Sequence, residues 1–272
     1  MASRSNPLVL PIAKIDQETE NVRTFTFEYE FNSRPGQFVM LWVPGVDQKP
    51  FSIANDKNGK FELTIFALGK ATNAVFEMKV GDKLGISGPY GSAYRFKKDS
   101  HVITVGGGYG AAPLAFATDN ARAAGCSVDF LVGARSKEDL LFEERAALAG
   151  ANVVVATDDG SKGHKGYVTD VLVEILEQRK KDGQLEDTKV LTCGPELMQH
   201  KVATICAEFG VPSEVSIERY MKCGFGICGN CTMDGTGQTT CLQGLVVSGE
   251  QALGLEEFGK YHRDKTGIRH EF

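Results

Sequence analysis

Two different rhythms of hydrophobic and polar residues divide the chain. Up to about Phe96, hydrophobic residues occur in short alternating or β-rich runs, separated by turn residues such as Pro35-Gly36 and Asn58-Gly59. The predicted strands cover residues 8–15, 22–28, 37–43, 61–67 and 83–87. Many short strands close together are typical of an antiparallel β-barrel.

After about Lys98 the pattern becomes an apolar strand, a glycine or polar turn, and then an amphipathic helix, repeated along the chain. The predicted strands cover residues 101–105, 127–133, 152–156 and 189–193, and the predicted helices cover 111–124, 137–148, 166–181 and 195–209. This alternation predicts a parallel, doubly wound α/β sheet. A last strand, residues 214–218, leads into a cysteine-rich segment.

The length of 272 residues exceeds the roughly 100–200 residues of a typical domain, so we expect more than one. The change of pattern places a barrel domain at residues 1–97 and an α/β domain at 98–213. A small cysteine module then covers 214–252, and a charged tail covers 253–272. We expect the tail to be a solvated end, or else to lie against a partner.

Composition excludes some classes of function. The chain has 30 basic and 35 acidic residues and a net charge of -5, which argues against nucleic acid as a general partner. The first eleven residues lack the basic start and apolar run of a signal peptide, and no stretch approaches the roughly twenty apolar residues of a membrane span. We therefore expect a cytoplasmic protein that does not enter a membrane.

Four of the seven cysteines follow the compact spacing C-x4-C-x2-C-x9-C: Cys223, Cys228, Cys231 and Cys241. Four thiolates in one short loop can saturate a 2Fe-2S cluster, and the intervening glycines allow backbone amides to turn toward the sulfur atoms. The first three cysteines match the plant-type ferredoxin spacing, but the fourth follows too soon for that whole domain. The spacing predicts an iron–sulfur module and therefore electron transfer.

Two other uses of these cysteines are weighed against the cluster. Four cysteines with one C-x2-C pair also suit tetrahedral zinc, although a zinc ribbon usually has two such pairs. A structural disulfide is disfavoured because the three remaining cysteines, Cys126, Cys193 and Cys206, make the total odd. The spacing favours the cluster over zinc.

A candidate flavin motif lies in the barrel, at Lys49, Pro50, Phe51 and Ser52. It supplies a cation, a rigid backbone, an aromatic face and a small hydroxyl, which suit the pyrophosphate, the ring and the N5 edge of a flavin. An ordinary strand with a proline at its entrance is the simpler explanation of the tetrapeptide taken alone.

A second barrel motif contains Gly69, Ala71 and Thr72 and precedes a short helical run over residues 73–79. Here Thr72 is predicted to cap the helix while free amides of the first turn face a diphosphate. The sequence Gly88-Pro89-Tyr90-Gly91 is interpreted as a plain turn that closes the barrel.

The predicted α/β domain has a glycine-rich strand-to-helix junction, in the context that a dinucleotide-binding loop requires. Small residues there would let a phosphate approach the helix N-terminus, and Ala111 takes the place of the third glycine of the usual fingerprint. The candidate binding residues are Gly106, Gly108, Gly110 and Pro113. A glycine-rich turn without a ligand is the alternative.

A later strand ends at Cys193, Gly194 and Pro195, at the edge of the sheet where ligands bind in open α/β folds. We expect the nicotinamide near Cys193, although a lone buried cysteine is more often a core residue. Arg135 and Lys137 end another strand and could contact a 2'-phosphate or a plain ribose. The choice between NAD and NADP stays open.

Together, these motifs resemble the ferredoxin reductase superfamily, and specifically the electron transfer subunits of heterotetrameric dihydroorotate dehydrogenase. The most specific part is the lead-in Ser216-Ile217-Glu218-Arg219-Tyr220-Met221 followed by the compact cysteine spacing. The resemblance implies FAD on the barrel, NAD(P) on the α/β domain and the cluster at the surface. It further implies that Ser52 and Cys193 lie beside the hydride path. The partner it implies is an FMN-containing catalytic subunit that oxidises dihydroorotate in pyrimidine biosynthesis, in a complex with two copies of each subunit.

Two rival functions remain. The same motifs are similar to the small subunit of sulfide dehydrogenase or NADH-dependent ferredoxin–NADP oxidoreductase, which is distinguished by the large subunit that copurifies. A rival of another class is a nucleotide-binding interaction module whose cysteines hold zinc. A visible spectrum separates these, because flavin and iron–sulfur proteins are coloured and a zinc module is not.

Overall fold

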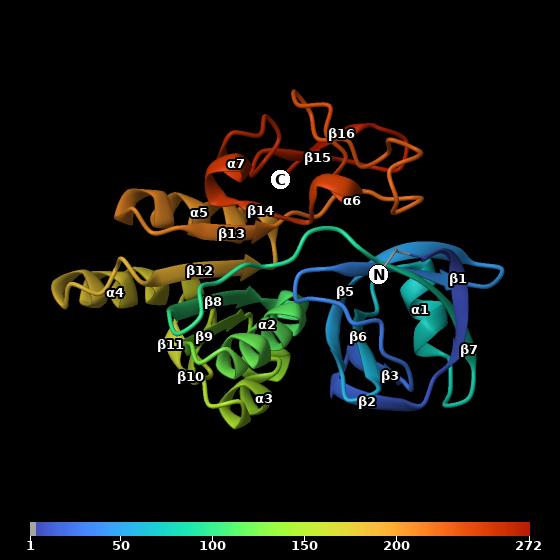
Figure 1. Cartoon of the computed structure of the whole chain (residues 1–272), viewed down its shortest axis with the longest axis horizontal. Coiled ribbons are helices and arrows are strands. Elements are labelled where there is room, and N and C mark those ends of the chain that lie inside the picture. Colours follow the sequence, from blue (N-terminus) through green and yellow to red (C-terminus); the bar gives the residue numbers. More distant parts are fainter. Residues whose placement is uncertain (1–3) are drawn as a thin grey trace.

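The computed structural model of the chain describes residues 4–272 and has three parts. In Figure 1 the N-terminal strands (blue) lie on one side, the α/β sheet (green to yellow) on the other, and the C-terminal segment (orange to red) across the top of both. Residues 1–3, which begin the predicted barrel domain, lie outside the described residues. In the described part, no helix is both long enough and apolar enough to cross a membrane.

The N-terminal part is an antiparallel half-barrel of seven strands in the order β1-β7-β4-β5-β6-β3-β2. Phenylalanine and branched side chains fill its interior, including Phe25, Phe27 and Phe61, which no solvent reaches. Its elements are β1 (Arg4–Pro11), β2 (Lys14–Thr19), β3 (Val22–Phe27), β4 (Phe38–Val43), β5 (Asp47–Lys57), β6 (Lys60–Phe66), α1 (Lys70–Phe76) and β7 (Lys83–Tyr90).

Two details of the barrel differ from the prediction. The strand predicted over residues 8–15 is two strands, because the chain turns a corner at Ile12, whose amide bonds to Asp82, and Ala13, whose amide bonds to Thr26. The eleven-residue strand β5 was not among the predicted strands, although an ordinary strand was the alternative explanation of Lys49–Ser52. Its first half is only partly buried and contains Pro50, so it lacks the alternation of a half-buried strand.

The second part is a seven-stranded sheet in the order β11-β10-β9-β8-β12-β13-β14, parallel except for β14. Helices cover both faces, with α2 and α3 on one core and α4 and α5 on the other, so the predicted doubly wound sheet is confirmed. Its elements are β8 (His101–Gly107), α2 (Ala111–Ala123), β9 (Ser127–Ala134), α3 (Glu143–Leu148), β10 (Asn152–Thr157), β11 (His164–Lys165), α4 (Val168–Lys181), β12 (Thr188–Cys193), α5 (Glu196–Phe209), β13 (Ser213–Ser216) and β14 (Val246–Ser248).

One predicted helix of the α/β domain is shorter in the structure than predicted. Residues 137–148 form a short 3-10 turn, Lys137–Asp139, and then α3. The break lies at Phe142, which has a left-handed backbone with φ of 63° and cannot continue a helix. Phe142 nevertheless packs against the core under α2, so tertiary contacts outweigh the local helical pattern.

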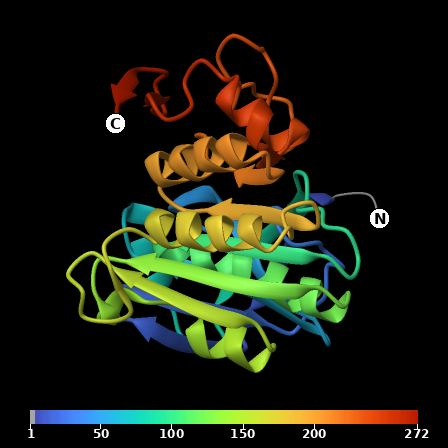
Figure 2. The same cartoon turned by 90° about the vertical axis from the view of Figure 1, so that its left-hand side faces the viewer.

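The cysteine-rich segment continues the α/β sheet. Strand β14, which follows the last cysteine of the loop, pairs antiparallel with β13, which precedes the loop. The remaining elements are α6 (Thr240–Gln243), α7 (Gly249–Leu253), β15 (Tyr261–Arg263) and β16 (Arg269–Glu271). Figure 2 shows these C-terminal elements stacked beyond α5, and α7 packs directly on α5.

The expectation of a solvated tail is wrong for its first residues. Phe258 and Tyr261 are almost completely buried, and the Tyr261 hydroxyl donates to Asp234 of the cysteine segment at 2.8 Å. Arg263 also donates to Asp234, at 2.8 Å, and Arg269 lies 3.5 Å above the Tyr261 ring. Most residues after Tyr261 are exposed. The tail therefore holds the cysteine segment in place while its hairpin faces solvent.

A buried ion network joins the tail to the α/β sheet through Arg219. Its guanidinium donates to Glu196 at 2.7 Å, at the start of α5, and to Glu257 at 3.2 Å. It also donates to the carbonyl of Glu218 at 2.7 Å. Because Arg219 lies four residues before the first cysteine of the loop, this network fixes the entry to the loop.

We expect Arg219→Met to destabilise the protein by about 3–5 kcal/mol, because it leaves two carboxylates buried without a cation. Chemical denaturation at pH 7 measures the loss. The matched control is Lys97→Met, since Lys97 pairs with Asp187 at 3.4 Å on the surface, where both side chains are mostly exposed. That change should cost less than about 1 kcal/mol. Equal losses in the two variants would contradict the role of Arg219.

Candidate cofactor and iron–sulfur site

The four cysteines of the loop come together as two pairs. Cys223 and Cys228 interact through their side chains, as do Cys231 and Cys241. Cys231 and Cys241 are buried, whereas Cys228 is exposed. The backbone holds the second pair, since the amide and hydroxyl of Thr240 both donate to the carbonyl of Cys231 at 2.9 Å.

Backbone amides surround one thiol of the loop. Burial opposes ionisation of Cys223, but hydrogen bonds from the amides of Cys228, Phe225 and Ile227 outweigh it and lower the pKa of the Cys223 thiol to about 6. For Cys241, burial and the neighbouring Cys231 raise the pKa of the thiol to about 12. A metal that coordinates these sulfurs would remove that proton.

This donor set fits an iron–sulfur core. Four thiols arranged two by two, with amides directed at a sulfur, are what a binuclear cluster requires from its protein. Among residues 4–272, no three His, Cys, Asp or Glu side chains converge on a single metal position.

The loops at the two central strands of the α/β sheet lie against each other. Strands β8 and β12 are neighbours at the point where the strand order reverses. A side chain on Gly110 would overlap the carbonyl of Cys193, and one on Gly107 would come within 2.8 Å of Pro195. The structure therefore brings together the predicted Gly106–Pro113 and Cys193–Pro195 segments, at the place where open α/β folds bind ligands.

Two residues without a predicted role, Tyr109 and Glu218, lie close to Cys193. The charge of Glu218 raises the pKa of the Tyr109 phenol, as does burial, and it acts on Cys193 as well, so all three side chains lie close together. Burial is the main cause that raises the pKa of the Cys193 thiol to about 12, so this thiol is neutral. The sequence could have indicated both residues by their position, because Tyr109 and Glu218 each follow a strand that ends at the ligand-binding edge of the sheet.

Glu218 occupies an unusual environment. Its side chain is reached by solvent, yet so many atoms surround it that desolvation is the largest influence and raises the pKa of its carboxyl. The nearby Glu196 raises it further, whereas Arg219 and His262 lower it. A carboxyl with a raised pKa keeps its proton to a higher pH than an ordinary glutamate, and while protonated it is able to donate a hydrogen bond.

The predicted flavin motif lies on β5, next to the cysteine segment. Ser52 pairs with Phe38 of β4, and Lys49 pairs with Leu41. The ammonium of Lys49 is 3.0 Å from Asp47 and 5.0 Å above the ring of Tyr220, directly before the cysteine loop. Ser52 and Cys193, the two predicted catalytic residues, therefore stand on different sheets.

The helix predicted over residues 73–79 begins earlier in the structure. Helix α1 starts at Lys70 with Gly69 as its N-cap residue, so Thr72 lies inside the first turn and caps the helix from there, by accepting a hydrogen bond from the Gly69 amide. The Thr72 hydroxyl accepts hydrogen bonds from the amides of Leu68 and Gly69, both at 2.9 Å. A diphosphate near Gly69, Ala71 and Thr72 stays a prediction.

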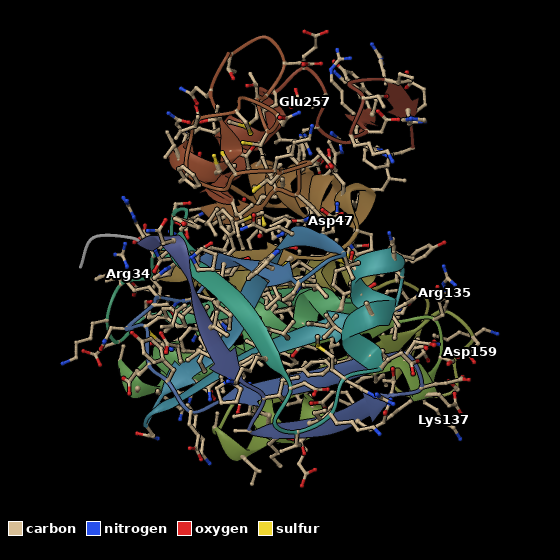
Figure 3. The ribbon with its side chains drawn as sticks, turned by 90° about the vertical axis from the view of Figure 1, so that its right-hand side faces the viewer. Arg34, Asp47, Arg135, Lys137, Asp159 and Glu257 are labelled. Carbon is tan, nitrogen blue, oxygen red and sulfur yellow. The ribbon has the colours of Figure 1, made fainter. Side chains whose placement is uncertain are left out.

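Figure 3 shows Arg135, Lys137 and Asp159 together at one edge of the α/β domain, and Asp47 below the segment that carries Glu257. The loop that follows β9 and the loop that follows β10 are bonded, because the amide of Asp159 donates to the carbonyl of Arg135 at 3.2 Å. Hydrogen bonds from Ser161 lower the pKa of the Asp159 carboxyl. A fixed carboxylate thus lies beside the two predicted cations.

A groove of about 1600 Å³ lies elsewhere, between the half-barrel and α3. None of the predicted cofactor residues lines it. Salt bridges connect the two sides of this groove: Arg145 of α3 is 2.8 Å from Asp119 and 3.8 Å from Glu62 of β6. This groove is the ion-paired junction of the two domains.

Comparison with known proteins matches each part of the chain. Residues 9–94 match an oxidoreductase FAD-binding domain, residues 104–204 an oxidoreductase NAD-binding domain, and residues 218–251 the iron–sulfur cluster binding domain of dihydroorotate dehydrogenase B. A probable dihydroorotate dehydrogenase B (NAD(+)) electron transfer subunit from Methanocaldococcus jannaschii is 41% identical over 96% of this chain and 97% of its own. The chain belongs to this family of electron transfer subunits.

Other similar proteins support the same assignment. The corresponding protein of Methanothermobacter thermautotrophicus is 41% identical over 99% of both chains. A solved structure of NADH-dependent reduced ferredoxin–NADP oxidoreductase, studied for flavin-based electron bifurcation, superposes with a TM-score of 0.79 and 28% identity over 89% of each chain. The chain is therefore an oxidoreductase flavoprotein with FAD-binding, NAD-binding and iron–sulfur cluster binding domains.

The close approach of the two loops predicts that Gly110→Ala is destabilising. The new methyl group would meet the Cys193 backbone, which cannot move as a flexible side chain can, so we expect a loss of about 1–3 kcal/mol. Thermal unfolding measures it. Gly254→Ala is the matched control, because Gly254 has a helical φ of -80° and only ordinary contacts. A fully stable Gly110→Ala protein would contradict this close packing of the two loops.

The raised pKa of Glu218 predicts a pH-dependent stability. The folded state favours the protonated carboxyl, so its contribution is complete below the ordinary pKa of 4.5 and is lost as the pH rises through the folded value. Glu218→Gln mimics the protonated form. Its melting temperature should equal that of the wild type near pH 4 and exceed it at pH 7–8. Glu208→Gln, on an exposed position of α5, controls for the charge, and a pH-independent difference would refute the expectation.

Proposed function

We propose that this chain carries electrons between NAD and a catalytic partner subunit, using FAD on the half-barrel and a 2Fe-2S cluster in the cysteine loop. The observation that carries the proposal is the direct packing of the loop on the barrel. A side chain on Gly224, between Cys223 and Cys228, would overlap Met40 of β4, the strand that pairs with the candidate flavin strand β5. This packing supports a flavin site and a cluster site that lie next to each other.

Each part of the site then has a role. When bound, FAD supplies the exchange of a hydride with the nicotinamide and of single electrons with the cluster. In this proposal the hydroxyl of Ser52 would donate to the flavin edge, with Pro50 and Phe51 beside it, and Lys49 would supply a positive charge at the entrance. Cys223, Cys228, Cys231 and Cys241 hold the cluster.

On the α/β domain, Gly106, Gly108, Gly110 and Pro113 form the loop that receives the dinucleotide phosphates. Cys193, Gly194 and Pro195 lie against this loop and hold the nicotinamide end. The neutral thiol of Cys193 offers an uncharged surface there, which suits a ring that changes its charge when it transfers a hydride. Asp159, beside Arg135 and Lys137, disfavours a 2'-phosphate and so favours NAD over NADP.

The partner follows from the name of the relatives, electron transfer subunit, and from the surface around the loop. Cys228 is exposed, and so are the apolar side chains of Ile227, at 78%, and Leu242, at 56%. Exposed apolar residues beside a redox centre suit a protein partner. The partner proposed is an FMN-containing dihydroorotate dehydrogenase catalytic subunit, with two copies of each subunit. Among the described residues no two cysteines form a disulfide, which suits the cytoplasm.

A second candidate function is supported by the similarity to NADH-dependent ferredoxin–NADP oxidoreductase, which covers 89% of the chain. Its small subunit would use the same three sites with a different large subunit. Affinity purification of the tagged chain from its native source, followed by mass spectrometry, identifies that subunit.

Replacement of one cysteine of the loop by serine tests the proposed route. In anaerobically purified Cys228→Ser protein we expect the iron content to fall, or the cluster to resist reduction, with at least about tenfold slower electron transfer to the partner. Bleaching of the flavin by NADH should continue at nearly the wild-type rate, since the variant leaves the nicotinamide and flavin sites intact. Iron analysis, electron paramagnetic resonance and stopped-flow absorption measure these quantities.

The matched control is Cys126→Ser. Cys126 is a buried thiol outside the loop that already contacts polar atoms, the carbonyl of Lys97 at 3.2 Å and the hydroxyl of Ser100 at 3.8 Å. Normal coupling in Cys228→Ser would refute the route through the cluster. Wild-type protein that contains neither iron nor flavin would refute the whole proposal.

A further inference from the structure

The connection between β7 and β8 contains a deeply buried tyrosine, Tyr94. In Figure 1 this connection (teal to green) leads from the half-barrel to the α/β sheet beneath the C-terminal segment. Connecting segments usually lie on the surface. Tyr94 is nevertheless only 5% exposed, although it belongs to none of the predicted motifs. Its burial indicates that the connection is held firmly between the two sheets.

The backbone of Tyr94 is bonded to the half-barrel. Its amide donates to the carbonyl of Pro35 at 2.9 Å, in the turn that precedes β4. A side chain on the next residue of that turn, Gly36, would lie 3.0 Å from both the amide nitrogen and the ring of Tyr94. Gly36 also has a φ of 94°, which favours glycine. The turn and the tyrosine therefore pack in direct contact.

The same turn holds the candidate flavin strand β5. The carbonyl of Gln37 accepts a hydrogen bond from the amide of Ile53 at 3.1 Å, and Ile53 directly follows Ser52. The side-chain amide of Gln37 donates to the carbonyl of Gly91 at 3.1 Å, at the start of the connection. The flavin strand, the turn and the connection are thus joined by hydrogen bonds into one unit.

The side chain of Tyr94 reaches the other sheet. Its hydroxyl donates to the carbonyl of Thr192 at 2.9 Å, and the hydroxyl of Thr192 donates in turn to the carbonyl of Val105 at 2.9 Å. No solvent reaches Thr192 or Val105. Thr192 directly precedes Cys193 on β12, and Val105 directly precedes Gly106 on β8. Two buried hydrogen bonds therefore connect Tyr94 to the ends of both strands that carry the candidate dinucleotide site.

We propose that Tyr94 is a positioning residue for hydride transfer, which holds the ends of β8 and β12 at a fixed place relative to the candidate flavin strand β5. The inference rests on the proposed function, since it concerns a nicotinamide near Cys193 and a flavin near Ser52. These two residues stand on different sheets, so their separation depends on how the sheets are joined. Reacting atoms must come within about 3–3.5 Å, and an error of about 1 Å can cost about a hundredfold in rate.

Anaerobic stopped-flow absorption of the holoprotein mixed with NADH tests the role of the hydroxyl. Tyr94→Phe keeps the ring and removes the bond to Thr192. At saturating NADH we expect flavin reduction to be about tenfold slower, because the nicotinamide end of the site is no longer held in place. The long-wavelength absorption band of a nicotinamide stacked on a flavin should weaken as well. FAD content, iron content and the half-saturating NADH concentration should stay close to wild-type values.

The matched control is Tyr261→Phe. Tyr261 is 2% exposed, and its hydroxyl donates to Asp234 at 2.8 Å, so this variant also loses one buried hydrogen bond. The bond lies in the C-terminal segment and not between the two sheets. Both variants should melt at a lower temperature than the wild type, but Tyr261→Phe should reduce its flavin at the wild-type rate. Equal slowing in the two variants would contradict the positioning role.

A second variant breaks the next bond of the chain. Thr192→Val keeps the branched shape and loses the bond to the carbonyl of Val105, so it should slow flavin reduction in the same direction as Tyr94→Phe. Wild-type rates and an unchanged absorption band in both variants, with full FAD content, would overturn the inference and leave the proposed function standing. Wild-type protein whose bound flavin is not reduced by NADH would overturn the proposed function itself.

Discussion

The structure depends on one contact, the packing of the cysteine loop on the outer face of β4 and β7. Met40 and Tyr90 supply the barrel surface, and Gly224 supplies a backbone without a side chain, so the loop approaches to van der Waals distance. A larger residue at Gly224 would separate the two parts. Because β4 also pairs with β5, this contact sets the distance between the candidate flavin strand and the thiols.

The rest of the C-terminal segment maintains this contact. Strands β13 and β14 hold the two ends of the loop side by side in the α/β sheet. Arg219 fixes the entry through Glu196 and Glu257, and the tail holds the middle through Asp234. A loop that binds a cluster contains little regular structure of its own, so its shape depends on such anchors. The tail is therefore part of the site's framework.

In the α/β domain, glycines likewise allow two loops to approach each other closely. Two loops from β8 and β12 meet so closely that Gly107, Gly110 and Gly194 leave no room for side chains. Their meeting brings Cys193 near Tyr109 and Glu218, residues that lie far apart in sequence. Tyr109 also stacks on Phe66 of the barrel, at 5.8 Å, so the edge of the dinucleotide site and the barrel are in direct contact. The three parts converge on one region.

The sequence by itself determined the order of the three parts, most strands and helices of the α/β sheet, and the four cysteines, because these depend on short-range periodicity and spacing. Only the tertiary structure decided the break at Phe142, the position of Thr72 inside α1, the buried start of the tail and the surroundings of Glu218 and Tyr90. Each of these depends on residues distant along the chain, such as Met40 and Gly224. Local patterns carry no information about such pairs, whereas burial and electrostatics in the folded chain do.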